Sequence, residues 1–300
     1  MKQNRILVII VTYNAMPWVH RCLTSLRQSV VPCDVTIVDN GSTDGTLDYI
    51  LNNFPEVDLI RNKENLGFGQ ANNIGLQKAL DNNYDFVYLL NQDAWILEDT
   101  FKHLIEASEA HPEYGVLSPM QMKADGLHFE EKFKSYIIPH HQIFSPSLTE
   151  DLYFHRAEDV YEVSFVMAAH WLITSKCLAI VGGFSPSFPH YGEDNNYLNR
   201  TNYWKFKIGI VPSAQAVHDR CDSKWTIEKE MYVNDYIGSL VSFSNPLHRE
   251  SIDTKIIQLL KRGISNRQMD LIKYALRLKK ERSSAKANFE ISLKEKAFLK

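Results

Sequence analysis

The feature that most constrains the fold is a regular alternation of apolar runs and amphipathic stretches in the first third of the chain. Short, mainly apolar runs occur at 6–11, 34–39, 57–61 and 85–90, and helical spacing follows each of them at 17–29, 44–53, 68–82 and 97–111. Strands that are apolar on both faces and alternate with helices predict a parallel sheet covered on both sides. We therefore expect an α/β fold with a mostly parallel sheet and helices on both faces.

The alternation breaks down from about residue 115. A strand is expected at 115–122, an irregular loop or β excursion at 123–160, a strand at 160–174, helices at 175–184 and 192–204, and a strand at 207–212. Helical spacing resumes beyond residue 225. These patterns predict two parts, an α/β domain over residues 1–225 and a helical, basic C-terminal extension over residues 226–300.

The charge of the chain is unevenly distributed. The net charge is -3, which argues against a generally nucleic-acid-binding surface, yet residues 250–300 contain 13 Lys and Arg against six Asp and Glu. A basic tail on an acidic body indicates either contact with an anionic surface such as membrane headgroups or a solvated lysine-rich helix.

The cysteines and the lengths of the apolar runs indicate where in the cell the protein is found. The four cysteines show neither CxxC pairing nor metal-ligand spacing, which is typical of reduced thiols in a cytoplasmic protein. The run at 6–11 is too short for a signal peptide, and no run approaches the roughly 20 apolar residues that span a bilayer. We expect a cytoplasmic protein, either soluble or held peripherally at the inner face of the plasma membrane.

Polar residues end three of the four expected strands. They are Thr12-Tyr13-Asn14, Asp39-Asn40 and Asn91-Gln92-Asp93. Asn and Asp are ordinary turn residues, but ligands of open α/β sheets bind at the carboxyl ends of the strands. Three polar ends therefore predict a binding site at one edge of the sheet.

The sequence lacks the motifs of two classes of nucleotide-binding protein. The glycines at 67, 69 and 75 do not make G-x-G-x-x-G and follow the third expected strand, and no G-x-x-x-x-G-K-[ST] occurs. A dinucleotide-binding oxidoreductase and a P-loop nucleotidase are both disfavoured.

Six strings carry a family resemblance. In chain order they are VTYNAMPWVHRCLTSL, IVDNGSTDGT, NKENLGFGQANNIG, YLLNQDAWI, LAIVGGFSPSF and YGEDNNYLNR. Together they resemble inverting nucleotide-sugar glycosyltransferases of family 2, especially bacterial rhamnosyl- and galactofuranosyltransferase-like members, over about residues 5–225. The resemblance implies a GT-A fold, which is a Rossmann-like α/β arrangement.

The resemblance implies a metal site for Mn²⁺ or Mg²⁺. In the family, the acid that ends the fourth strand holds a divalent metal against the donor diphosphate, and here that acid is Asp93. Asn91 replaces the first acid of the D-x-D motif, so Asn91 is expected to contribute an amide oxygen or a water-mediated contact. His218 lies where relatives place a further ligand. The alternative is that Asp93 only caps the helix expected near residue 97.

The resemblance also implies a donor site. Asp39 is expected to read the base imide N–H of uracil or thymine, which points to a UDP- or dTDP-sugar. Further donor-side positions are Thr12 and Asn14 beside the base and ribose, Asn65, Gly67 and Asn72 in the third loop, and Trp95 beside the sugar. Arg220 is expected either to contact the diphosphate or to be an ordinary surface arginine.

For catalysis, the family's Glu-Asp pair corresponds to Glu193 and Asp194. Asp194 is expected to be the general base and Glu193 to orient the acceptor, although acids also favour a helix N-terminus through the macrodipole. Trp171 is expected either to stack on an acceptor sugar or to be an aromatic core residue.

The expected activity is metal-dependent, inverting transfer of a sugar to a saccharide or lipid-linked saccharide in surface polysaccharide synthesis. One alternative is a sugar-1-phosphate nucleotidyltransferase, whose Gly-rich loop with Arg and Lys is missing from VTYNAMPW. The other is a degenerate, non-catalytic member that binds saccharide or nucleotide, which the departure at Asn91 leaves open.

Overall fold

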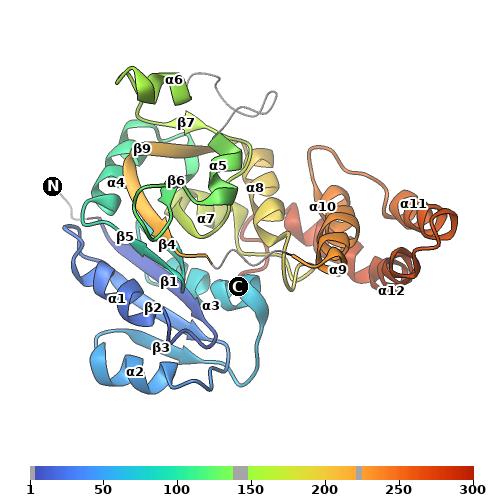
Figure 1. Ribbon diagram of the computed structural model, residues 1–300, viewed down its shortest axis with the longest axis horizontal. Helices are drawn as coiled ribbons and strands as arrows, with labels where there is room; N and C mark the ends of the chain where they lie inside the picture. Colours follow the sequence, from blue (N-terminus) through green and yellow to red (C-terminus); the bar gives the residue numbers. More distant parts are fainter. Residues whose placement is uncertain (1–3, 138–147, 221–224) are drawn as a thin grey trace.

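The fold is built on one nine-stranded sheet (Figure 1). It is seen in a computed structural model that describes residues 4–137, 148–220 and 225–300. The strand order is β3-β2-β1-β4-β8-β6-β9-β5, with β7 paired to β9. The strands are β1 (Ile6–Thr12), β2 (Asp34–Asp39), β3 (Asp58–Arg61), β4 (Phe86–Asn91), β5 (Ala94–Ile96), β6 (Tyr114–Met122), β7 (Tyr161–Glu162), β8 (His170–Thr174) and β9 (Lys207–His218).

The sheet is parallel in its first half and mixed in its second. Strands β3, β2, β1 and β4 are parallel neighbours, as predicted from the alternation. Strand β8 runs antiparallel to both β4 and β6, and β5 and β7 run antiparallel to β9. The α/β class is confirmed, and the antiparallel strands come from the part of the chain where the alternation breaks down.

Successive residues of these strands point to opposite faces of the sheet, and both sets are apolar. Helices therefore cover both faces. On one face, Ile6, Val8 and Ile10 pack with α1 (Val19–Arg27), α2 (Thr46–Asn53) and α4 (Thr100–Ala110). On the other face, Leu7 and Ile9 belong to a core that includes α3 (Gly67–Asp81), α7 (Ser175–Val181) and α8 (Glu193–Tyr203). Both cores consist of hydrophobic side chains, and the polar strand ends are not members of either.

Two expectations for the middle of the chain were wrong. The segment 123–160, expected to be irregular or β, contains the helices α5 (Glu131–Ile137) and α6 (Leu148–Tyr153), while residues 138–147 lie outside the described part. The strand expected over 160–174 is two strands, β7 and β8, because the chain between them leaves the sheet. That intervening segment lines the cavity described below.

The C-terminal helices pack around a core of their own. They are α9 (Ile227–Met231), the π-helix η1 (Tyr232–Ile237), α10 (Gly238–Ser244), α11 (Ile252–Ser265) and α12 (Met269–Ser292). Phe188 and Tyr191 from the α/β part join this core, and α11 and α12 project farthest from the sheet (Figure 1). Within the described residues, no helix combines the length and the apolar character that a membrane span needs.

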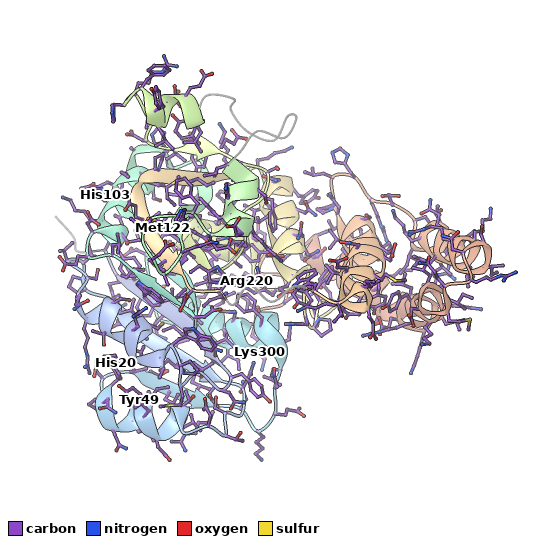
Figure 2. All side chains as sticks on the ribbon, viewed as in Figure 1. His20, Tyr49, His103, Met122, Arg220 and Lys300 are labelled. Atoms are coloured by element: carbon purple, nitrogen blue, oxygen red, sulfur yellow. The ribbon has the colours of Figure 1, made fainter. Side chains whose placement is uncertain are left out.

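The last residues of the chain return to the α/β part. The backbone N–H of Gly183 donates to the carbonyl of Ala297 at 2.7 Å, and that of Lys296 to the carbonyl of Ile180 at 3.1 Å. Lys300, labelled in Figure 2, lies beside α3, where its N–H donates to Gln77 at 2.6 Å. The predicted extension 226–300 is therefore helical, but its final segment packs on the other part.

Candidate active site

The polar strand ends lie together at one edge of the sheet. Strand β1 lies between β2 and β4, with Thr12 in register with Asp39 and Val11 in register with Asn91. The predicted convergence of the three polar ends is therefore a feature of the structure.

Asp39 is completely buried and organises the turn after β2. One carboxylate oxygen accepts the backbone N–H groups of Gly41 and Ser42, each at 2.9 Å, and the other accepts the hydroxyls of Thr12 at 2.8 Å and Ser42 at 2.5 Å. Both oxygens are thus used within the protein. Thr12 is buried as well, so in this structure the two side chains shape the turn from beneath, and their contacts with the base and the donor stay predictions.

Asn14 ties the β1 and β2 loops together. It is half-buried and has a positive φ of 54°. Its side-chain carbonyl accepts the N–H of Thr43 at 2.9 Å, and its own N–H donates to the Ser42 hydroxyl at 2.8 Å. Asn14 stays a candidate donor contact at the rim.

In the third loop the predicted residues have mainly structural roles. Gly67 has a φ of 78°, and a Cβ there would lie 2.3 Å from the carbonyl oxygen of Pro189, so only glycine fits. The exposed Asn65 accepts the Gly67 N–H at 2.8 Å. Asn72 is buried in α3 and donates to the carbonyl of Phe68 at 3.0 Å, so its expected donor contact is corrected.

Two residues that the motif analysis quoted without a role connect the loops. Asn40 donates to the carbonyl of Gly67 at 3.3 Å and accepts from the Asn62 amide at 2.9 Å. Gln92 accepts the Tyr13 N–H at 2.7 Å and donates to the Tyr13 carbonyl at 3.3 Å. The middle residue of Asn91-Gln92-Asp93 therefore holds the β1 loop against the β4 loop.

A cavity of about 440 Å³ gathers the chemically active side chains. Five predicted site residues line it, namely Asn91, Asp93, Glu193, Asp194 and His218. Other parts of its wall come from segments 165, 167–169 and 190–192, and from Lys132, Arg220 and Trp225. The remaining predicted residues, Thr12, Asn14, Asp39, Asn65, Gly67, Asn72, Trp95 and Trp171, are not among its lining residues.

Asp93 and His218 form a pair suited to a divalent cation. Strand β5 starts directly after Asp93 and pairs Ala94 with His218, which brings the carboxylate oxygen Oδ1 within 3.5 Å of Nε2 of the imidazole. His218 is 4% exposed, and its Nδ1 has no hydrogen-bond partner among the described residues. One carboxylate and one imidazole fit Mn²⁺ or Mg²⁺ when substrate phosphates supply further ligands. The described residues contain no larger His, Cys, Asp or Glu cluster with that capacity.

His170 fixes the backbone beside His218 and was missed by the sequence analysis. Burial, helped by the charge of His218, lowers the pKa of His170 to about 3, so the ring is neutral. Its Nε2 lies 3.0 Å from the Val217 carbonyl and therefore donates to it, while Nδ1 accepts from the Tyr88 hydroxyl at 2.8 Å. This buried pair positions the end of β9.

Glu193 and Asp194 open α8 at the cavity wall. The preceding Gly192 has a φ of 83°, and a Cβ there would lie 2.6 Å from Ile237. Glu193 is 9% exposed, its Oε2 has no hydrogen-bond partner within the described part of the chain, and burial together with Asp194 raises its pKa to about 8. Asp194 uses Oδ1 to accept the backbone and side-chain N–H groups of Asn195 at 2.8 and 3.3 Å.

Both carboxyl groups of this pair are desolvated, and their hydrogen bonding differs. Burial also raises the pKa of Asp194, and it opposes two hydrogen bonds that stabilise the anion. Two neighbouring acids in a desolvated wall do not both ionise readily, and the group with the higher pKa keeps the proton. The pKa of about 8 keeps the proton on Glu193 at neutral pH, and the hydrogen bonds from Asn195 favour the anion of Asp194.

Neither predicted tryptophan contact is found. Trp171 is fully buried, is stacked on Phe184 with ring centroids 6.3 Å apart, and donates from Nε1 to the Val166 carbonyl at 3.2 Å. It is a core residue, so the acceptor contact is corrected. Trp95 is half-buried and is not among the lining residues, with the guanidinium of Arg21 4.6 Å from its ring centre, and its sugar contact stays a prediction.

Comparison with known proteins agrees with this arrangement. The sequence model described as Glycosyl transferase family 2 matches residues 7–168. The chain belongs to glycosyltransferase family 2. It is 26% identical over 234 residues to the N-acetylglucosaminyl-diphospho-decaprenol L-rhamnosyltransferase of Mycobacterium tuberculosis, an alignment that covers 72% of this chain and 76% of that protein.

Solved structures show that this family 2 glycosyltransferase has the GT-A fold. Staphylococcus aureus TarS in complex with UDP matches 87% of this chain and 72% of its own, with a TM-score of 0.56 and 18% identity. The mannosyltransferase PcManGT from Pyrobaculum calidifontis, in complex with GDP-Man and Mn²⁺, matches 87% of this chain and 65% of its own, with a TM-score of 0.54 and 16% identity.

Proposed function

We propose that this glycosyltransferase is metal-dependent and inverting, and that it transfers a sugar from a nucleoside-diphosphate sugar to a hydroxyl of a saccharide or lipid-linked saccharide. The observation that carries the proposal is the single cavity in which the Asp93–His218 pair and the Glu193–Asp194 pair meet. An inverting transfer needs both, a place for the departing diphosphate and a base for the attacking hydroxyl. UDP- and dTDP-sugars are the donors that we propose to test first.

Asp194 is the base in this proposal. The acceptor oxygen attacks the anomeric carbon, the bond from that carbon to the diphosphate oxygen breaks on the opposite side, and the hydroxyl proton passes to the Asp194 carboxylate. The raised pKa of Asp194 brings the base closer to neutral pH, where proton transfer is most effective. Protonated Glu193 donates a hydrogen bond to an oxygen of the acceptor or the donor.

The leaving diphosphate is bound on the side of Asp93 and His218. These two residues would hold Mn²⁺ or Mg²⁺, with Asn91 alongside, and such an ion neutralises phosphate charge when it is bound. Arg220 also lines the cavity, and we assign it to the diphosphate. His170 keeps the His218 backbone in place without facing the substrate.

Thermal unfolding with UDP, dTDP, GDP and ADP, each with and without Mn²⁺, tests the proposal. A nucleotide at 100 times its Kd adds about 2.7 kcal/mol of stability. For a protein of this size that raises the unfolding midpoint by roughly 2–4 °C. We expect a shift that requires the metal and disappears in Asp93→Asn. Metal-dependent nucleotide binding without any sugar transfer would instead favour the non-catalytic alternative.

We also propose that the acceptor is lipid-linked and that the α11–α12 hairpin meets an anionic membrane surface. The name of the mycobacterial relative describes a diphospho-decaprenol acceptor. In this chain, Ile257 and Ile264 of α11 are 52% and 69% exposed, and Met269 and Leu276 of α12 are 63% and 57% exposed. Residues 252–282 contain nine Lys and Arg against three Asp and Glu. Exposed apolar side chains among lysines are typical of a helix that lies on a membrane surface.

A further inference from the structure

One wall of the cavity contains Lys132, Tyr191 and Trp225, and Lys229, which is not among the lining residues, lies against the two aromatic rings. The ring of Trp225 has the Lys132 ammonium 4.1 Å and the Lys229 ammonium 4.9 Å from its centre. The Tyr191 ring is centred 5.4 Å from that of Trp225, and Lys229 lies 5.2 Å from the Tyr191 ring centre. We call Lys132, Tyr191, Trp225 and Lys229 the aromatic–lysine wall. None of the four was singled out in the sequence.

The cations of this wall have no direct ion-pair partner in the described structure, although the charges of Glu130 and Asp194 act on Lys132. Burial and the nearby charges of Arg220 and Lys229 lower the pKa of Lys132. None of these three cations makes an ion pair with a residue in 4–137, 148–220 or 225–300. Cations that crowd one another in a partly desolvated place are unfavourable without an anion, so their arrangement favours an anionic ligand.

The wall lies on the acceptor side of the cavity. Lys132 comes from α5, Tyr191 immediately precedes α8, and Trp225 and Lys229 follow β9, so none belongs to the loops after β1, β2 and β3. Lys132 is also close enough to act electrostatically on Asp194. An acceptor held here has its hydroxyl next to the base.

We propose that the aromatic–lysine wall binds the acceptor as a sugar phosphodiester or diphosphate, with the sugar against Trp225 and Tyr191 and the phosphate between Lys132 and Lys229. This inference rests on the proposed function and narrows its acceptor to a phosphate-linked saccharide. The C–H face of a pyranose matches an aromatic ring, and phosphate oxygens accept charge-assisted hydrogen bonds from ammonium groups. The nucleotide-sugar donor also contains a diphosphate. The test therefore distinguishes binding of the acceptor diphosphate from binding of the donor diphosphate at this wall.

The test measures equilibrium binding of three probes to the full chain. They are N-acetylglucosamine linked through a diphosphate to a short-chain prenol, octyl N-acetylglucosaminide as its neutral counterpart, and UDP with Mn²⁺. We expect wild type to bind the diphosphate probe at least roughly tenfold more tightly than the neutral probe. One or two charge-assisted hydrogen bonds are enough for a difference in Kd of that size. The Lys132→Ala/Lys229→Ala variant should lose that preference and keep wild-type affinity for UDP.

Further variants separate charge, stacking and folding. Lys134→Ala removes an exposed lysine from the same helix as Lys132 and should behave as wild type, and Lys132→Arg should keep the preference. Trp225→Leu should weaken both sugar probes equally and leave UDP unchanged. Equal affinity of wild type for both sugar probes would overturn the proposal, and so would a parallel loss of UDP binding in the lysine variant, which would assign the cations to the donor. Failure of every nucleotide to bind wild type would refute the transferase proposal separately, since the two sugar probes do not depend on it.

Discussion

At the scale of single residues, Asp194 and Glu193 have different environments although they are adjacent. Asp194 has two hydrogen bonds from Asn195 that stabilise its anion, whereas Oε2 of Glu193 is buried without a partner in the described structure. In the proposed mechanism, environment rather than residue type therefore separates the base from the proton donor, as in other paired-carboxylate sites.

Asp194→Asn should reduce the transfer rate by about 10²–10⁴, the usual contribution of a general base, with nucleotide affinity unchanged. Asp48→Asn is the matched control, because Asp48 also lies in the first turn of a helix but is exposed and far from the cavity in sequence and fold. The measurement is initial transfer rate together with nucleotide-induced thermal shift. Equal rates in wild type and Asp194→Asn would show that Asp194 serves only the helix terminus.

Glu193 should make the free energy of unfolding depend on pH. Its pKa is about 8 in the fold against an ordinary value of 4.5, so between these values the folded chain holds a proton that the unfolded chain has lost. The contribution of this group is therefore fully present below about pH 4.5 and declines as pH rises towards 8. Urea unfolding at pH 5 and pH 7.5 should show Glu193→Gln gaining stability over wild type at the higher pH. Parallel pH profiles for the two proteins would contradict the assignment.

At the scale of elements, the Gly182-Gly183 pair does more than end α7. Gly182 has a φ of 80°, and a Cβ there would lie 2.2 Å from the Ala297 carbonyl oxygen and 2.4 Å from the Ala297 nitrogen. A helix end and the returning C-terminal segment thus meet backbone to backbone. The contact links α7 to the last residues of the extension, which are distant in sequence.

Gly182→Ala should destabilise the protein by more than the roughly 1–3 kcal/mol that a backbone conformation peculiar to glycine costs alone, because the Cβ would also meet Ala297. Gly126→Ala is the control, since Gly126 has a φ of 65° and open space around it. In a chain ending at Glu295, the cost of Gly182→Ala should fall because the clash partner is gone, whereas the cost of Gly126→Ala should not change. Urea unfolding of these four variants and their two parent chains measures the costs, and an unchanged cost of Gly182→Ala in the shortened chain would argue against the backbone contact.

At the scale of the whole molecule, the cavity and the helices proposed to contact a membrane lie at different ends. The α/β part holds the cavity, and the α11–α12 hairpin projects away from the sheet (Figure 1). A lipid-linked acceptor requires its carrier to remain in the membrane while its sugar reaches Asp194. A separate membrane-binding hairpin and a phosphate-binding wall would together meet that need.

Vesicles that contain anionic lipid should sediment the wild-type protein. Lys261→Glu/Lys273→Glu/Lys280→Glu should lower the partition coefficient by roughly 100-fold, since each lysine near an anionic surface contributes about 1 kcal/mol. Lys102→Glu, an exposed position on α4, is the single-site control and should sediment like wild type. Equal partitioning of the triple variant and wild type, or equal binding to neutral vesicles, would count against the membrane contact.

The sequence by itself determined the first four strands, their helices and the edge at which the candidate site lies. Apolar periodicity is local, so the first four strands and their helices follow from it, and the polar residues at the strand ends predict the convergence of Asp39, Asn91 and Asp93. Motif strings also identified the family and the Glu193–Asp194 pair, because those residues occur in short contiguous segments.

Only the tertiary structure decided which side chains face the cavity. Aspartate and tryptophan are residue types that often contact ligands. Asp39 and Trp171 are nevertheless buried, because side chains from other elements pack against them. The aromatic–lysine wall joins α5, the start of α8 and the segment after β9, and no local pattern relates positions so far apart. Side-chain direction and long-range proximity depend on how the elements pack, and packing is a property of the assembled chain.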